Sequence, residues 1–136
     1  MSRALLDTSV LLLPPERLRV VTAAYDELAI SVATVGEVEY GLLGAGTDWA
    51  LRFRRDLAHR NMLRLFKVLP FDREAAREYA KVCFLVRQRG RTHRRRAVDL
   101  MIAATASAHE VPLLTANAAD LRGAEALVEI VAVSGS

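Results

Sequence analysis

Four acidic residues stand at points where apolar, strand-like segments give way to turns or helices. They are Asp7, Glu37, Asp99 and Asp120. In an open parallel sheet the carboxyl ends of the strands border one crevice, so carboxylates far apart in the chain can meet there. Carboxylates crowded together repel one another, and a hard divalent cation relieves that repulsion. The pattern therefore predicts a Mg²⁺ or Mn²⁺ site formed by these four side chains, of the kind that cleaves phosphodiesters.

The first two acids also have structural interpretations. Asp7 ends an apolar segment and is followed by two hydroxyl residues, so it can serve as a turn or N-cap residue. Thr34 and Glu37 have the spacing of a capping box, in which the glutamate reaches back to the N-cap amide. The same position puts Glu37 in the first helical turn beside the crevice, whereas Glu39 is expected to point elsewhere.

The other two acids are open to similar alternatives. Asp99 introduces an alanine-rich apolar helix, where it can complement the helix dipole or pair with Arg95 or Arg96 at the surface. In the last segment, either Asn117 or Asp120 can face the crevice, and either can be a cap or turn residue. The four acids together, at successive strand ends, favour the shared site.

Strand-like and helix-like segments alternate along the chain, which predicts the elements that hold these acids. The strand-like segments are residues 3–6, 29–33, 67–69, 112–114 and 129–133. The helix-like segments are residues 16–28, 35–43, 48–65, 73–89 and 98–109, and residues 48–65 place Trp49, Phe53, Leu57 and Leu65 near one stripe. The alternation indicates an α/β protein, a three-layer α/β/α sandwich around a mostly parallel four- to five-stranded sheet. We expect residues 1–136 to form a single domain.

The composition supports a compact protein of the reducing cytoplasm. Its 136 residues are 52% hydrophobic, which argues against disorder. The single cysteine, Cys83, cannot form an internal disulfide, and no Cys/His cluster suggests zinc. The apolar stretches are shorter than a membrane span requires, and the N-terminus does not resemble a signal peptide.

Arginines cluster in one segment of this chain, whose net charge is +3. Residues 87–96 contain no acid and carry six of them: Arg87, Arg89, Arg91, Arg94, Arg95 and Arg96. Such a segment suits the phosphate backbone of a nucleic acid, although a solvated helix end and loop is the alternative.

Four segments, in this order, resemble the motifs of PIN-domain ribonucleases. They are LLDTSV (residues 5–10), VGEVEYG (35–41), RAVDLMIAATA (96–106) and LTANAADL (114–121). Among PIN proteins, short chains like this one resemble the VapC group, the toxins of bacterial type II toxin–antitoxin pairs. The resemblance covers almost the whole chain.

The resemblance implies a PIN-like fold and Mg²⁺- or Mn²⁺-dependent endoribonuclease activity. It also implies a homodimer and inhibition by a VapB-like antitoxin whose C-terminal segment enters the active-site groove. Asp7, Glu37 and Asp99 match the acidic ligands of the family, and Asp120 supplies the fourth acid where Asn117 replaces another possible one. Thr8, Ser9, Thr115 and Asn117 are expected to support the ligands or bind phosphate, and the six arginines to bind the RNA backbone.

Two other functions fit parts of the sequence. The first is a non-catalytic, PIN-like nucleic-acid-binding partner protein. The second is a phosphoryl-transfer protein, either a receiver domain or an aspartyl-phosphate phosphatase. The phosphatase is disfavoured because Ser9 stands where its second aspartate is expected, and the receiver because Lys67 and Lys81 are the only lysines and neither follows the late strand.

Overall fold

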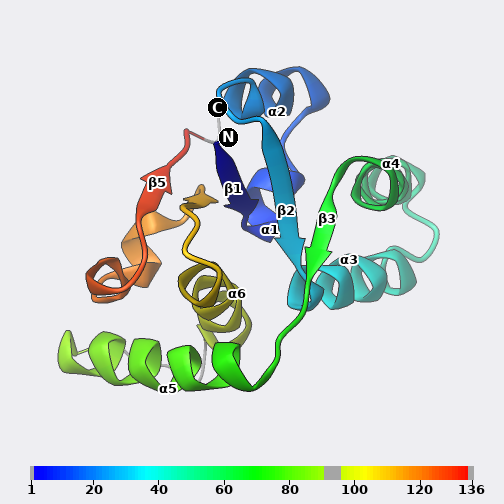
Figure 1. Ribbon diagram of the computed structural model, residues 1–136. Coiled ribbons are helices and arrows are strands. Elements are labelled where there is room, and N and C mark those ends of the chain that lie inside the picture. The colour runs from blue at the N-terminus through cyan, green and yellow to red at the C-terminus, as the bar shows by residue number, and fades with distance from the viewer. Residues whose placement is uncertain (1, 91–95, 135–136) are drawn as a thin grey trace.

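The computed structural model describes residues 2–90 and 96–134. Within that range, five strands form one sheet in the order β3-β2-β1-β4-β5, with every neighbouring pair parallel (Figure 1). The strands are β1 (Arg3–Leu6), β2 (Glu27–Ser31), β3 (Lys67–Leu69), β4 (Leu113–Thr115) and β5 (Ile130–Ala132). The strand order reverses between β1 and β4, and open α/β sheets bind ligands at the carboxyl ends of strands at such a point.

The strand register aligns the ends of the three central strands. Leu6 at the end of β1 pairs with Ile30 of β2 on one side and with Leu114 of β4 on the other. The next residues are Asp7, Ser31 and Thr115, which therefore emerge side by side at one edge of the sheet.

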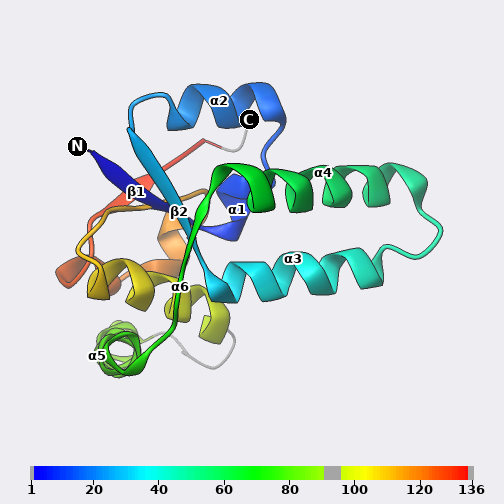
Figure 2. The same cartoon turned by 45° about the vertical axis from the view of Figure 1, so that its right-hand side comes forward.

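Helices cover both faces of the sheet, as the sequence predicted for a three-layer α/β protein. The helices are α1 (Thr8–Leu11), α2 (Pro15–Thr22), α3 (Val32–Gly44), α4 (Trp49–Leu65), α5 (Arg73–Gln88), α6 (Ala97–Ala108) and the short 3-10 helices η2 (Ala118–Leu121) and η3 (Ala124–Ala126). Figure 2 shows α2 and α4 on one side of the sheet, and α5 and α6 on the other. The hairpin of α3 and α4 projects beyond the sheet edge.

Alternating side chains of β1 supply the two cores. Leu5 packs in the core beneath α5 and α6, with Val82 and Leu100. Leu6 packs in the core beneath α1, α2 and α4, with Leu11 and Met62 among its members. This period-two alternation is why the short strand can be apolar throughout and still serve both faces. None of the helices in the described residues is long and apolar enough to cross a bilayer.

Some predicted boundaries are correct because both ends carry local signals. Helix α5 begins after Asp72, whose carboxylate accepts from the Ala75 amide, and ends near Gly90, where φ is +75°. Asp48 caps α4 in the same way, by accepting from the Leu51 amide.

Other predicted elements are wrong in extent or in orientation. The helix expected over residues 16–28 ends at Thr22, and the second strand starts at Glu27 instead of residue 29. The apolar stripe expected along α4 is not its buried face: Trp49 and Phe53 are exposed, whereas Ala58 and Met62 are buried. The packing of α4 therefore uses a different side of the helix from the one that its largest side chains suggest.

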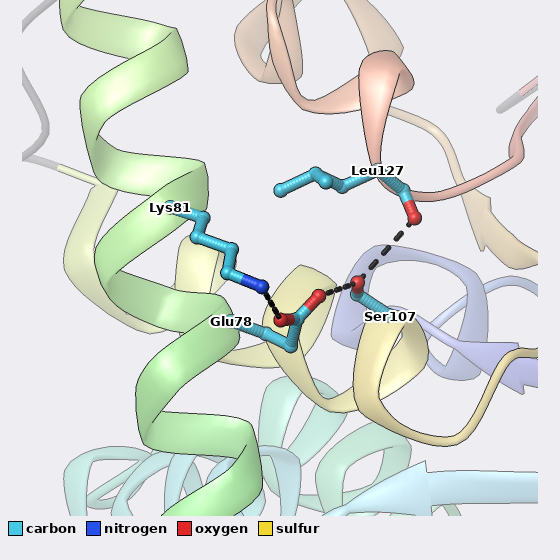
Figure 3. Close-up of polar contacts among 4 residues, drawn as sticks. All are labelled: Glu78, Lys81, Ser107 and Leu127. Carbon is cyan, nitrogen blue, oxygen red and sulfur yellow. Dashed lines mark hydrogen bonds and ion pairs between the residues drawn. The ribbon is translucent and has the colours of Figure 1, made fainter.

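A polar cluster fastens α5 to α6 (Figure 3). Glu78 of α5 accepts a hydrogen bond from Ser107 of α6 and pairs with Lys81 at 2.9 Å. Ser107 Oγ also lies 3.3 Å from the carbonyl oxygen of Leu127. The hydrogen bond from Lys81, followed by that from Ser107, lowers the pKa of Glu78. Because α6 carries Asp99 in its first turn, this fastening helps to fix the position of that carboxylate.

Gly123, between η2 and η3, occupies a position that only glycine suits. Its φ is +104°, and a Cβ there would lie 2.7 Å from the carbonyl oxygen of Leu85. We expect Gly123→Ala to lower the free energy of unfolding by about 2–4 kcal/mol, through backbone strain and steric overlap. Urea denaturation followed by circular dichroism measures the change.

The matched control is Gly36→Ala. Gly36 lies inside α3, and a Cβ there would meet no atom within 4 Å. This substitution is expected to raise the free energy of unfolding by up to about 1 kcal/mol, because alanine is the better helix former. Equal effects of the two substitutions would contradict the assignment of strain to Gly123.

Candidate active site

Asp7 lies at the carboxyl end of β1 and is only 4% exposed. Its Oδ2 accepts hydrogen bonds from Ser9 Oγ and Thr115 Oγ1, both at 2.8 Å. Ser9 Oγ in turn accepts from the backbone amide of Ala116 at 3.0 Å. A buried carboxylate needs such hydrogen bonds, and here they also fix its direction between α1 and β4.

Glu37 of α3 is held by a hydroxyl group of α1. Thr8 Oγ1 lies 2.5 Å from Glu37 Oε1 and 3.1 Å from Thr34 Oγ1. The capping-box interpretation of Thr34 and Glu37 is wrong, because α3 begins three residues earlier than expected. Its N-cap is Ser31, whose hydroxyl accepts from the Ala33 amide, so Thr34 lies inside the helix and Glu37 in the second turn.

Glu39, two residues further along α3, is directed to a different place. Its Oε1 lies 2.9 Å from Nε2 of His59 on α4. The two glutamates therefore have different surroundings: Glu37 faces the hydroxyl of Thr8, and Glu39 contributes to the α3–α4 hairpin.

The pKa of Asp99 depends on the other three acids as well as on burial. Burial raises the pKa of Asp99 from 3.8 to about 6, and the negative charges of Asp7, Glu37 and Asp120 act in the same direction. The positive charge of Arg96 lowers this pKa but does not outweigh the other effects. Three carboxylates from other parts of the chain thus lie close enough to Asp99 to oppose its ionisation.

Asp120 is partly exposed. It lies on η2, and its Oδ1 is 3.5 Å from Nη2 of Arg96. The negative charge of Asp120 acts on Asp99. Asn117 has an exposed side chain and donates its backbone amide to Thr115 Oγ1 at 3.0 Å.

The arginine segment is described only at its two ends. Arg87 and Arg89 are exposed at the end of α5, where Arg89 lies beside Gly123. Arg96 lies at the acidic group, next to Asp120. The predictions for Arg91, Arg94 and Arg95 fall outside the described residues.

Sequence reasoning missed a hollow that opens beside Glu37. Its volume is about 250 Å³, and its lining includes Thr8, Leu12, Glu37, Tyr40, Gly41 and Arg55. The motif over residues 35–41 contained Tyr40 but assigned it no role. Arg55 gave no signal at all, because it reaches the hollow from α4 across the hairpin.

Comparisons with known proteins agree with this fold. Residues 4–125 match the PIN domain family. VapBC-5 from Mycobacterium tuberculosis, a member of the VapBC family of toxin–antitoxin systems, is 32% identical. That match covers 98% of this chain and 100% of the other, with a TM-score of 0.76. FitAcB from Neisseria gonorrhoeae is 26% identical, with 93% and 95% covered and a TM-score of 0.73.

A third solved structure supports the fold alone. VapBC2 from Rickettsia felis, bound to a DNA fragment from its promoter, is 19% identical, with 96% and 98% covered and a TM-score of 0.74. No curated protein matches the sequence. The family match spans most of the chain, and the structural matches extend over nearly all of it. The chain therefore belongs to the PIN domain family and is of the VapC type.

Proposed function

We propose that the protein is a Mg²⁺- or Mn²⁺-dependent endoribonuclease and the toxin of a type II toxin–antitoxin pair. The observation that carries the proposal is the grouping of Asp7, Glu37 and Asp120 around Asp99, whose pKa is raised to about 6 by burial first and by these three charges in addition. A folded protein gains nothing in stability from such repulsion. Carboxylates grouped at the carboxyl edge of a parallel sheet are instead typical of a functional site.

The donor set fits a hard divalent cation. The side chains gathered here offer carboxylate and hydroxyl oxygens, which Mg²⁺ and Mn²⁺ prefer over nitrogen or sulfur. No three His, Cys, Asp or Glu side chains in the described residues form a ready-made cage. Mg²⁺ usually keeps several waters and takes only one or two carboxylates directly, so a loose group of acids suits it. A bound cation would make hydroxide available near neutral pH and stabilise charge on the phosphate.

The residues of the chain have distinct tasks in this proposal. Asp7 and Asp99 are the principal ligands, and the hydroxyls of Ser9 and Thr115 keep Asp7 oriented. Glu37, held by Thr8, and Asp120 complete the acidic set and orient the attacking water. Attack of that water on phosphorus breaks the bond to the 3′ oxygen, which leaves a 5′-phosphate and a 3′-hydroxyl. Arg96 and the arginines of residues 87–95 bind the RNA backbone, so binding should weaken with salt.

The proposed partners are a VapB-like antitoxin and a second copy of this chain. The similar protein VapBC-5 is a member of the VapBC family of toxin–antitoxin systems, which supports the antitoxin. The α3–α4 hairpin exposes Leu43, Trp49 and Phe53, each with more than half of its surface accessible. Apolar side chains gathered on one projecting hairpin favour a protein partner, and we assign this surface to the homodimer.

A non-catalytic nucleic-acid-binding protein is the alternative. All four acids are present and grouped, which disfavours a degenerate catalytic site. The phosphoryl-transfer interpretations are set aside because the chain belongs to the PIN domain family.

The protein, purified free of antitoxin, is expected to cleave single-stranded RNA in Mg²⁺ or Mn²⁺. Removal of the cation with EDTA should lower the rate by more than about 100-fold, because a cation-activated water is lost. Gel analysis of total RNA measures cleavage with the cation and in EDTA, and mapping of the new 5′ ends locates the cuts. Undiminished cleavage in EDTA would exclude the cation site, and no cleavage of any RNA would favour the non-catalytic alternative.

A further inference from the structure

A partly buried guanidinium lies one helical turn from the acidic group. Arg55 extends from α4 across α3, where its side-chain atoms lie 3.6–3.9 Å from the position of a Cβ on Gly41. Its Nη1 donates to the carbonyl oxygen of Gly41 at 2.5 Å. Glu37 and Gly41 are four residues apart on α3, which corresponds to about 6 Å along the helix axis.

Capping of α3 explains only part of the placement of Arg55. Gly41 is among the last four residues of α3, whose carbonyl groups lack the usual intrahelical partners, so one donor of Arg55 satisfies it. A guanidinium has five N–H donors in a planar fork. In the described residues no carboxylate forms an ion pair with Arg55. Arg55 also lines the hollow beside Glu37 and brings a positive charge to it.

An aromatic ring stands at the same hollow. Tyr40 precedes Gly41 on α3 and is 78% exposed, yet it contributes to the lining together with Glu37 and Arg55. We therefore do not count Tyr40 among the exposed apolar side chains of the α3–α4 hairpin that we assign to the homodimer. An exposed aromatic face beside a guanidinium is the combination with which proteins bind single-stranded nucleic acids, by stacking a base and pairing with its phosphate.

We propose that this hollow is a nucleotide subsite, in which Tyr40 stacks the base next to the cut and Arg55 binds the adjoining phosphate. The spacing between the acids and Arg55 along α3 fits this subsite, because the scissile phosphate at the acids and a phosphate at Arg55 would be neighbours on one extended RNA strand. The guanidinium fork matches the phosphate oxygens, whereas the acids alone would repel them. This subsite rests on the proposed ribonuclease function and adds a way to hold one specific nucleotide.

Steady-state cleavage kinetics test the subsite. The substrate is single-stranded RNA carrying a site that the wild-type protein cuts, labelled at its 5′ end. Tyr40→Ala and Arg55→Gln should each raise KM about tenfold, the effect expected for one stacked base or one charged contact. The value of kcat should stay within about threefold, because the acids are untouched. Tyr40→Phe, which keeps the ring, should restore the wild-type KM.

A modified substrate adds a readout that misfolding cannot imitate. RNA with an abasic residue on one side of the cut should raise the KM of the wild-type protein as Tyr40→Ala does. With Tyr40→Ala the same abasic substrate should show no further increase, because the two changes remove one contact. If Arg55→Gln destabilises α3, the comparison of the abasic substrate with Tyr40→Ala still tests the subsite, because Tyr40 is exposed.

Phe84→Ala and Arg60→Gln serve as controls. Phe84 is an exposed aromatic residue on α5, and Arg60 is an exposed arginine on α4 that pairs with Asp56. Neither should change KM. Cleavage by the wild-type protein with unchanged KM in Tyr40→Ala would overturn the subsite and leave the ribonuclease standing. Failure of the wild-type protein to cleave any RNA would overturn the proposed function and the subsite with it.

Discussion

Asp7→Asn is expected to lower the rate of Mg²⁺-dependent RNA cleavage by at least about 100-fold, while the protein stays folded. The substitution removes one negative charge from the proposed cation site. It keeps an oxygen that can accept from Ser9 and Thr115, the two hydroxyl groups that now hold Oδ2 of Asp7 at 2.8 Å. Single-turnover cleavage of labelled RNA measures the loss, and circular dichroism with thermal unfolding checks the fold.

Asp56→Asn is the matched control for this prediction. Asp56 is an aspartate on α4 whose carboxylate pairs with Arg60 at 2.8 Å, at the surface. Its substitution should leave the cleavage rate within about twofold of the wild-type rate, because exposed ion pairs contribute little. If Asp7→Asn cleaved RNA as fast as Asp56→Asn does, Asp7 could not be a principal ligand.

The grouping of the acids was predictable because it follows from the order and direction of the strands more than from the exact bounds of each element. Asp7 and Thr115 end strands that the sequence shows as short apolar segments, and parallel strands bring such ends to one edge whatever the helices between them do. A boundary error of one or two residues, as in the second strand, did not move any of the four acids to the other edge of the sheet. The fold class was predictable for the same reason.

The start of α3 was not predictable, because two local signals compete there. Ser31 and Thr34 are both good N-cap residues, and the glutamate three positions after Thr34 favours the second. The choice depends on contacts outside the segment. Ser31 is fully buried against Thr105 of α6, and Thr34 faces Thr8, 26 residues away in the chain. The charge of Glu37 therefore acts on Asp99 from the second turn of α3 and not from the first turn that the sequence predicted.

The hollow beside Glu37 could not be predicted from the sequence, for a different reason. Arg55 meets Gly41 only because α3 and α4 pack as a hairpin, and the angle of that hairpin depends on side-chain packing along its whole length. Neither residue belongs to a periodic pattern that points to the other. Contacts between helices of this kind are therefore found from coordinates, whereas the edge of a parallel sheet can be found from strand ends.

Asp99→Asn is expected to stabilise the cation-free protein while abolishing cleavage. In the folded protein the pKa of Asp99 is about 6, above its ordinary value of 3.8. The folded state therefore binds more protons than the unfolded state between about pH 4 and pH 6, and stability falls as pH rises through that window. Such an elevation corresponds to at most about 3 kcal/mol, which partial exposure to solvent reduces to about 1–2 kcal/mol. The asparagine side chain carries no charge and escapes this cost.

Urea denaturation in EDTA, at about pH 7.5 and again near pH 4, tests the sign and the window. At the higher pH the variant should be more stable than the wild-type protein, and near pH 4 the gain should nearly vanish, because Asp99 is then protonated in the folded protein. Mg²⁺ should stabilise the wild-type protein more than the variant, since a ligand that binds only the folded state raises its stability. A variant that is less stable at both pH values would mean that favourable contacts of Asp99 outweigh the cost of its burial beside Asp7, Glu37 and Asp120. A gain that persists unchanged at low pH would have to come from packing, because the repulsion is absent there.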